Sequence, residues 1–196
     1  MKPKVIFSRE EMFRMNRDAL LERGVTIKDI AEIAFKQQSR YNDNVTMDVC
    51  IESVEKILSY RDIFHIVQLS IQIDKFTEEG KFQGPIQDIM KADLGMFGVD
   101  EILGLNIAQM YGVVGQTNFG DIDVNKPGIV KKLNDEGKLG VRCHTFLDDV
   151  VSALGAAAST RVAQILSENE SKKDPNYEPI RFEFEEAKAN KNDNKE

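Results

Sequence analysis

The chain has 196 residues, of which 41% are hydrophobic and 30% charged, and its formal net charge is −7. This length accommodates one domain with a substantial core, and the acidic balance argues against a nucleic-acid surface, which would be basic. Trp is absent and Pro is scarce, so helix is favoured over an all-β design. We therefore expect an all-α fold, a compact multihelical single domain.

The cysteines and the N-terminus indicate where the protein works. Cys50 and Cys143 are too few and too far apart for a disulfide framework, which favours reduced thiols in a cytoplasm. No signal-peptide pattern follows Met1, and no run approaches the roughly 20 apolar residues that span a bilayer. We expect a cytoplasmic protein, with peripheral contact at the inner face of the membrane and homo-oligomer formation both left open.

Capping signals mark the first three expected helices. Ser8 and Glu11 form a capping box, and the helix that follows ends near Gly24. Thr26 and Thr46 can cap the next two helices, which carry apolar residues at helical spacing. These local patterns predict three consecutive amphipathic helices.

The remainder of the chain divides into four parts. Segment 63–76 is apolar on most of its circumference, which predicts a buried central helix. Segment 111–128 is rich in glycine and matches no phosphate-loop pattern, and a final helix is expected over 145–168. Residues 169–196 are rich in charged side chains and predict a flexible tail after a helical domain over 1–168.

Two acidic pairs are the most informative feature of the sequence. Asp100 and Glu101 precede one uncharged segment rich in small residues, and Asp148 and Asp149 precede another. Adjacent carboxylates that enter apolar stretches are costly unless a cation neutralises them. Small residues let two helices approach, so both pairs could present oxygens to one hard cation. The alternative is that the acids only complement helix dipoles, but two matched pairs favour a metal site.

Two further charged residues stand between the pairs. Asp123 adds a carboxylate, and Lys126 lies three residues beyond it. Lys126 can form a structural salt bridge, which is the more frequent role, or meet a phosphate oxygen as a positive charge. Asp93, seven residues before Asp100, can join the same site if a turn folds it back, or can cap the following helix.

Cys143 and His144 suggest a competing chemistry. On a helix His144 would share a face with Asp148, four residues later, as a general acid, a metal ligand or a structural residue. A cysteine nucleophile is not supported, because consecutive side chains diverge on a helix and no phosphate-cradling arginine follows Cys143.

Four motifs together resemble a known family. They are Asp93-x-Gly95, Val99-Asp100-Glu101, Asp123-x-x-Lys126-Pro127 and Leu147-Asp148-Asp149. Their order and spacing are similar to those of the phosphatidylglycerophosphatase A family, above all its soluble YutG-like branch, which includes the low-temperature-requirement C proteins. The resemblance covers residues 8–168.

The resemblance implies a Mg²⁺-dependent phosphomonoester hydrolase, with Mn²⁺ as a substitute, that converts phosphatidylglycerophosphate to phosphatidylglycerol in phospholipid biosynthesis. It implies the metal ligands Asp93, Asp100, Glu101, Asp148 and Asp149. It also implies a catalytic set of Asp100, Glu101, Asp123, Lys126, Asp148 and Asp149, with Lys126 on the substrate phosphate.

Two alternative functions stay open at this point. The membrane-embedded branch of the family has spanning helices and a glycine where this chain has His144, so a soluble phosphate ester is an alternative substrate. A non-catalytic helical interaction or regulatory protein is the other alternative. Segment 24–31 resembles the entry to a helix-turn-helix motif, although the acidic charge argues against DNA.

Overall fold

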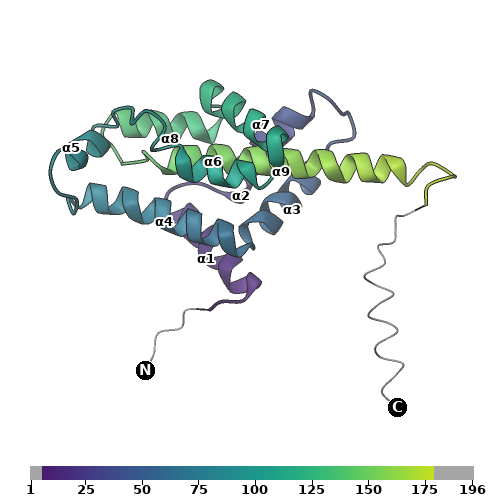
Figure 1. Ribbon diagram of the computed structural model, residues 1–196, viewed down its shortest axis with the longest axis horizontal. Helices are drawn as coiled ribbons and strands as arrows, with labels where there is room; N and C mark the ends of the chain where they lie inside the picture. Colours follow the sequence, from purple (N-terminus) through teal and green to yellow (C-terminus); the bar gives the residue numbers. More distant parts are fainter. Residues whose placement is uncertain (1–5, 179–196) are drawn as a thin grey trace, which may run out of the picture.

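One long helix at the C-terminal end forms the axis around which the other helices pack (Figure 1). The structure is a computed structural model that describes residues 6–178, and within them it contains nine helices and no strand. In chain order the helices are α1 (Arg9–Glu22), α2 (Ile27–Gln38), α3 (Met47–Leu58), α4 (Arg61–Glu78), α5 (Pro85–Lys91), α6 (Ile102–Gln109), α7 (Gly112–Asn125), α8 (Ile129–Lys138) and α9 (Leu147–Ser171). The predicted all-α, single-domain fold is confirmed.

The first three helices begin at the predicted caps. The Ser8 hydroxyl accepts the amide of Glu11 at 3.2 Å, and the Glu11 carboxylate accepts the Ser8 amide at 2.8 Å. Thr26 forms an equivalent box with Asp29, and Thr46 accepts an amide at the start of α3. Each cap satisfies amides that have no partner inside the helix, so these starts are encoded locally.

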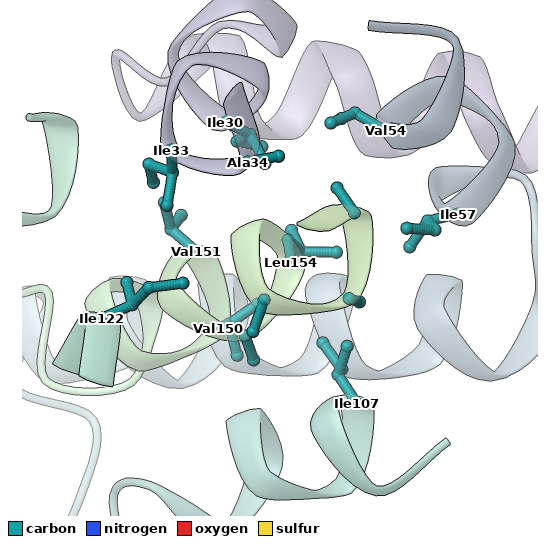
Figure 2. Packing of buried hydrophobic residues seen from close by; sticks show 14 of the residues in the cluster. Ile30, Ile33, Ala34, Val54, Ile57, Ile107, Ile122, Val150, Val151 and Leu154 are labelled. Carbon is teal, nitrogen blue, oxygen red and sulfur yellow. The ribbon is translucent and has the colours of Figure 1, made fainter. Parts of the chain in front are cut away.

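α9 is the central helix. It packs against α2, α3, α4, α6, α7 and α8, and its residues are buried continuously from Leu147 to Thr160. Figure 2 shows Val150, Val151 and Leu154 of α9 surrounded by apolar side chains from four neighbouring helices. The residues labelled there on these neighbours are Ile30, Ile33, Ala34, Val54, Ile57, Ile107 and Ile122. Small residues along α9 allow this many helices to approach it.

The expectation that segment 63–76 forms the central helix was wrong. This segment lies in α4, which buries one face but exposes Leu69, Phe76 and His65. Apolar residues on most of a circumference do not decide which helix is enclosed, because large side chains keep neighbouring helices apart. The enclosed helix is the one with small residues.

The glycine-rich segment 111–128 is mostly helical. α7 occupies Gly112–Asn125 and packs against α6 and α9. Glycine lowers helix propensity by about 1 kcal/mol per residue, so the local pattern does not identify this helix. Its packing against two neighbours supplies the missing stability.

α9 also bears on the membrane and tail predictions. Among the described residues it is the one helix long and apolar enough to cross a bilayer, although Ser and Thr interrupt its apolar run. Since 67% of its most apolar window is buried inside the fold, packing accounts for this composition.

α9 ends at Ser171, three residues beyond the predicted end, and residues 179–196 of the predicted tail lie outside the described part of the chain.

Candidate metal centre

A close approach between α6 and α9 brings the two acidic pairs together. A β-carbon at Gly104 of α6 would stand 2.8 Å from the carbonyl oxygen of Asp149 and 3.0 Å from its carbonyl carbon. Only glycine permits this backbone contact. Asp100 and Glu101 precede α6 directly, and Asp148 and Asp149 lie in the first turn of α9, so both pairs meet at one end of the contact.

Three carboxylates form the core of the site. Asp100, Glu101 and Asp149 each offer an oxygen atom, and these oxygens all lie within 4.8 Å of one another. Asp100 Oδ1 and Glu101 Oε2 are buried and have no hydrogen-bond partner among the described residues. Buried acceptors without partners are uncommon in native proteins, and a hard divalent cation with oxygen ligands would satisfy them. The residues therefore fit a magnesium-type ion.

The raised pKa values of these carboxyls also indicate a cation site. Burial, together with the charges of Asp148 and Asp123, raises the pKa of Asp149 to about 10. Burial and the neighbouring Asp100 carboxyl likewise raise the pKa of Glu101. With this pKa the Asp149 carboxyl holds a proton at neutral pH when no cation is present. A dication can take the place of that proton, which makes the site suited to bind one.

Lys126 supplies the positive charge beside this cluster. Its ammonium lies 2.7 Å from Asp123 Oδ1 and 3.2 Å from Asp148 Oδ2. Burial works against the charged form, but the Asp148 and Asp123 carboxylates outweigh it and raise the pKa of Lys126. Lys126 therefore stays protonated, and it holds two of the predicted site residues in place.

Asp148 borders the group of three carboxylates. Its Oδ2 faces Lys126, and its Oδ1 accepts the amide of Asp149 at 2.9 Å. Burial raises the pKa of Asp148 to about 6, with Lys126 acting in the opposite direction. The structure thus places Asp148 between the lysine and the three-carboxylate group, and its predicted role as a metal ligand stays a prediction.

Asp93 also lies close to the cluster. Its carboxylate accepts a hydrogen bond from the Thr145 hydroxyl at 3.1 Å, and its charge contributes to the raised pKa of Asp148. The alternative that Asp93 caps the following helix is wrong, because Glu101 occupies the N-cap position of α6. Asp93 is not one of the three carboxylates within reach of one ion, so its predicted role as a metal ligand stays a prediction.

His144 does not share a helical face with Asp148, because α9 begins only at Leu147. Its ring is buried, with Nε2 at 3.0 Å from Glu136 Oε2 and Nδ1 at 3.3 Å from the Arg23 guanidinium. Burial outweighs the effect of Glu136 and lowers the pKa of His144. The histidine forms part of a buried network before α9, in which Arg23 also binds Glu78 at 2.8 Å.

Asp74 is a buried residue that the sequence analysis missed. It projects from α4, and its two carboxylate oxygens accept the amides of Phe146 and Leu147 at 3.1 and 3.0 Å. Asp74 therefore caps the N-terminus of α9, from which Asp148 and Asp149 project. Burial raises its pKa to about 8. The signal in the sequence was a lone aspartate within the apolar segment 63–76.

The Cys143 thiol also belongs to this buried network. Its thiol lies 3.7 Å from Asp74 Oδ1 and 3.8 Å from the Met90 carbonyl oxygen. Burial raises the pKa of the Cys143 thiol to about 11, so the nucleophilic thiolate is disfavoured. Cys50 is likewise buried and free. These facts agree with the rejection of a cysteine nucleophile.

Comparisons with known proteins cover most of the chain. The uncharacterised protein YpjQ of Bacillus subtilis (strain 168) is 43% identical over 171 residues, which is 86% of this chain and 95% of that protein. The crystal structure of YpjQ superposes with a TM-score of 0.77 at 41% identity, over 83% of this chain and 99% of that one. The low temperature requirement C protein of Listeria monocytogenes superposes with a TM-score of 0.75 at 44% identity, over 80% and 97% of the two chains.

The family assignment rests on a direct match. The family model of phosphatidylglycerophosphatase A matches residues 32–164, a segment that contains all of the predicted site residues. Since this match covers more than half of the chain, and its acidic motifs converge in space, the chain belongs to the phosphatidylglycerophosphatase A family.

Proposed function

We propose that this protein is a Mg²⁺-dependent phosphomonoester hydrolase that converts phosphatidylglycerophosphate to phosphatidylglycerol. The observation that carries the proposal is the convergence of Asp100, Glu101 and Asp149, with two unpartnered buried oxygens, beside Lys126. The family match supports phosphatase chemistry and a lipid substrate. With such a substrate, we propose that the protein works at a membrane surface, on the cytoplasmic side.

The cation would be held by the Asp100, Glu101 and Asp149 carboxylates, whose oxygens lie within reach of a single ion. Asp93 and Asp148 lie nearby and are proposed as further ligands, directly or through water. A bound Mg²⁺ polarises a phosphoryl oxygen and lowers the pKa of a bound water. Mn²⁺, which also prefers oxygen ligands, is expected to substitute.

The protein's own residues would then bind the phosphate and move a proton. Lys126 keeps its charge, because Asp123 and Asp148 flank it, and it can meet a phosphate oxygen that would otherwise face only carboxylates. If Asp148 does not ligate the cation, its carboxylate, which lies between Lys126 and the Asp149 amide, is the group proposed to accept a proton from the attacking water. Asp123 orients the lysine through its 2.7 Å ion pair.

The test is phosphate release by the purified full-length chain. The substrates are phosphatidylglycerophosphate in mixed micelles, glycerol 3-phosphate and p-nitrophenyl phosphate, each assayed with Mg²⁺, with Mn²⁺ and with EDTA. We expect hydrolysis only with a cation, and a loss on the order of 100-fold or more in Glu101→Gln. Asp135→Asn is the control, because Asp135 is paired with Lys131 on the surface of α8 and should keep full activity.

Other outcomes of this assay would change the proposal. Phosphate release that persists in EDTA, or that survives Glu101→Gln, would exclude the metal-dependent mechanism. Hydrolysis of the soluble esters alone would replace the lipid by a soluble substrate. Cation binding without turnover of any ester would favour the regulatory function instead.

A further inference from the structure

The segment between α5 and α6 exposes an unusual set of apolar side chains. We name residues 92–102 the 92–102 loop, which includes the first residue of α6. Phe97 at its centre is fully exposed, and Leu94, Val99 and Ile102 are each 55% exposed. Four large apolar side chains within nine residues are therefore exposed on this loop, and we refer to them together as its apolar patch.

The backbone of this loop is strained in a way that presents Phe97 to solvent. Phe97 has a φ of +55°, and the next residue, Gly98, has a φ of +93°. Positive φ is common for glycine but disfavoured for a bulky aromatic residue. Because the ring is fully exposed, packing within the fold does not offset this strain. No contact within the described fold accounts for this strain, which suggests that Phe97 contacts a surface outside the protein.

The loop also carries part of the metal centre. Asp93 lies at its start, and Asp100 and Glu101 follow Val99 directly. The Met96 amide donates to Asp100 Oδ2 at 3.4 Å, which connects the turn bearing Phe97 to a predicted ligand. Any partner surface that contacts the Phe97 ring would therefore lie beside the carboxylate cluster.

If the substrate is a phosphorylated lipid, the metal centre must be able to reach the surface of a bilayer. The phosphate of a phosphorylated lipid sits at the surface of a bilayer, whereas the one described helix apolar enough to span a bilayer is largely buried in the core. The enzyme must then approach the surface from the aqueous side. Exposed aromatic and aliphatic side chains suit that approach, since they enter the boundary between headgroups and acyl chains.

We propose that the 92–102 loop is a membrane-docking surface, which inserts Phe97 and its apolar neighbours into a lipid bilayer and so brings a lipid phosphate to the acidic cluster. This inference rests on the proposed function. The net charge of −7 gives no general attraction to anionic membranes, so the contact is apolar. Binding to phosphatidylcholine vesicles should therefore be insensitive to salt.

The test compares the wild type with Phe97→Asn. Asparagine tolerates positive φ better than phenylalanine, so this variant keeps or raises the melting temperature while the ring is lost. Leu21→Gln is the control: Leu21 is an apolar residue that is 57% exposed, about as much as Leu94, Val99 and Ile102, but it lies on α1, across α4 from α6 in Figure 1. Co-sedimentation with phosphatidylcholine vesicles, with and without phosphatidylglycerophosphate, measures binding, and phosphate release is measured on lipid and soluble esters.

We expect Phe97→Asn to weaken vesicle binding about tenfold and to slow hydrolysis of the vesicle-borne lipid, because an inserted aromatic ring contributes about that much affinity. Hydrolysis of p-nitrophenyl phosphate should stay unchanged, and Leu21→Gln should match the wild type throughout. Equal vesicle binding by Phe97→Asn and the wild type would overturn the docking surface. A concentration-dependent dimer that Phe97→Asn abolishes, without vesicle binding, would assign the patch to a second copy of the chain and also overturn it.

The two proposals fail in different ways. If the wild type binds vesicles through Phe97 but hydrolyses no ester, the phosphatase proposal falls and the docking surface stands. If the wild type and Phe97→Asn hydrolyse the vesicle-borne lipid at the same rate, the phosphatase proposal stands and the docking surface falls.

Discussion

Asp149 shows how a single residue can oppose folding and still serve a site. Its side chain is buried, and its pKa is about 10 rather than the ordinary value of 3.8. The folded chain therefore binds a proton at Asp149 over a pH range in which the unfolded chain does not. Below about pH 4 both states are protonated at Asp149 and the residue costs no stability. As the pH rises from about 4 toward 10, the free energy of unfolding falls, because the buried carboxyl keeps a proton that the unfolded chain has released.

Asp149→Asn should remove this pH dependence. Without metal, we expect the free energy of unfolding of the variant to exceed that of the wild type by an amount that grows between about pH 5 and about pH 9, on the order of 1–3 kcal/mol. Urea denaturation in EDTA at several pH values measures it. Added Mg²⁺ should stabilise the wild type but not the variant.

Asp135→Asn is the control for this series. Lys131 lowers the pKa of Asp135 below its usual value of 3.8, so Asp135 does not titrate in this pH range. Its difference from the wild type should stay constant from about pH 5 to about pH 9. A parallel, unchanging difference for Asp149→Asn would show that Asp149 is ionised in the metal-free fold.

At the scale of elements, the close contact between α6 and α9 decides which acids can share an ion. Gly104 makes this contact possible, because its missing β-carbon leaves room for the Asp149 carbonyl group. Side chains on either helix could adjust to a larger residue, but backbone atoms cannot. The geometry of the metal centre is therefore tied to one glycine outside the set of carboxylates.

Gly104→Ala should separate the two acidic pairs. We expect it to destabilise the fold by about 1–3 kcal/mol, as overpacking does, and to weaken Mg²⁺ binding. Gly120→Ala is the matched control, since a β-carbon on this exposed residue of α7 meets nothing within 4 Å. It should stabilise the protein by about 0.5–1 kcal/mol. Chemical denaturation and isothermal titration with Mg²⁺ check both variants; unaltered Mg²⁺ affinity in Gly104→Ala would contradict the argument.

Asp74 connects α4 with the start of α9. It belongs to α4, yet it supplies the cap of α9 by accepting the amides of Phe146 and Leu147. The cap settles where α9 starts, and so where Asp148 and Asp149 project. A carboxylate outside the predicted set thereby supports the position of the site.

Asp74→Ala should leave two buried amides unpaired and cost about 1–3 kcal/mol. Asp74→Asn retains an acceptor and should recover part of that loss. Ser70→Ala is the control, because Ser70 is buried one turn earlier on α4 and its hydroxyl, within residues 6–178, donates only to the Val67 carbonyl of its own helix. Urea denaturation and amide exchange at Phe146 and Leu147 measure the effect, and equal losses in the Asp74→Ala and Ser70→Ala variants would argue against the cap.

At the scale of the whole molecule, both the segment matched by the family model and the last described helix end before the C-terminus. The matched segment is 32–164, and α9 ends at Ser171. We expect a chain lacking residues 179–196 to keep its melting temperature and its phosphate release. Thermal unfolding and the phosphate assay test this. A fall in melting temperature of more than about 4 °C would assign the segment a role in stability.

The sequence by itself determined the helical class, the first three helices and the candidate acids. Capping boxes and repeated acidic pairs lie within a few neighbouring residues, so they can be recognised without a fold. The family resemblance was also carried by short motifs, and it is confirmed. Local patterns misjudged α4, which is not central, and they did not identify the helix α7, because its glycines lower its helix propensity.

Only the tertiary structure decided which of these acids meet. Asp100, Glu101 and Asp149 converge because α6 and α9 touch at Gly104, while Lys126 stands against Asp148. The cap at Asp74 and the exposed ring of Phe97 depend equally on how distant segments pack. Short-range patterns encode where helices begin, but contacts between residues far apart in the chain depend on which backbones can approach, and that is settled by packing in the folded molecule.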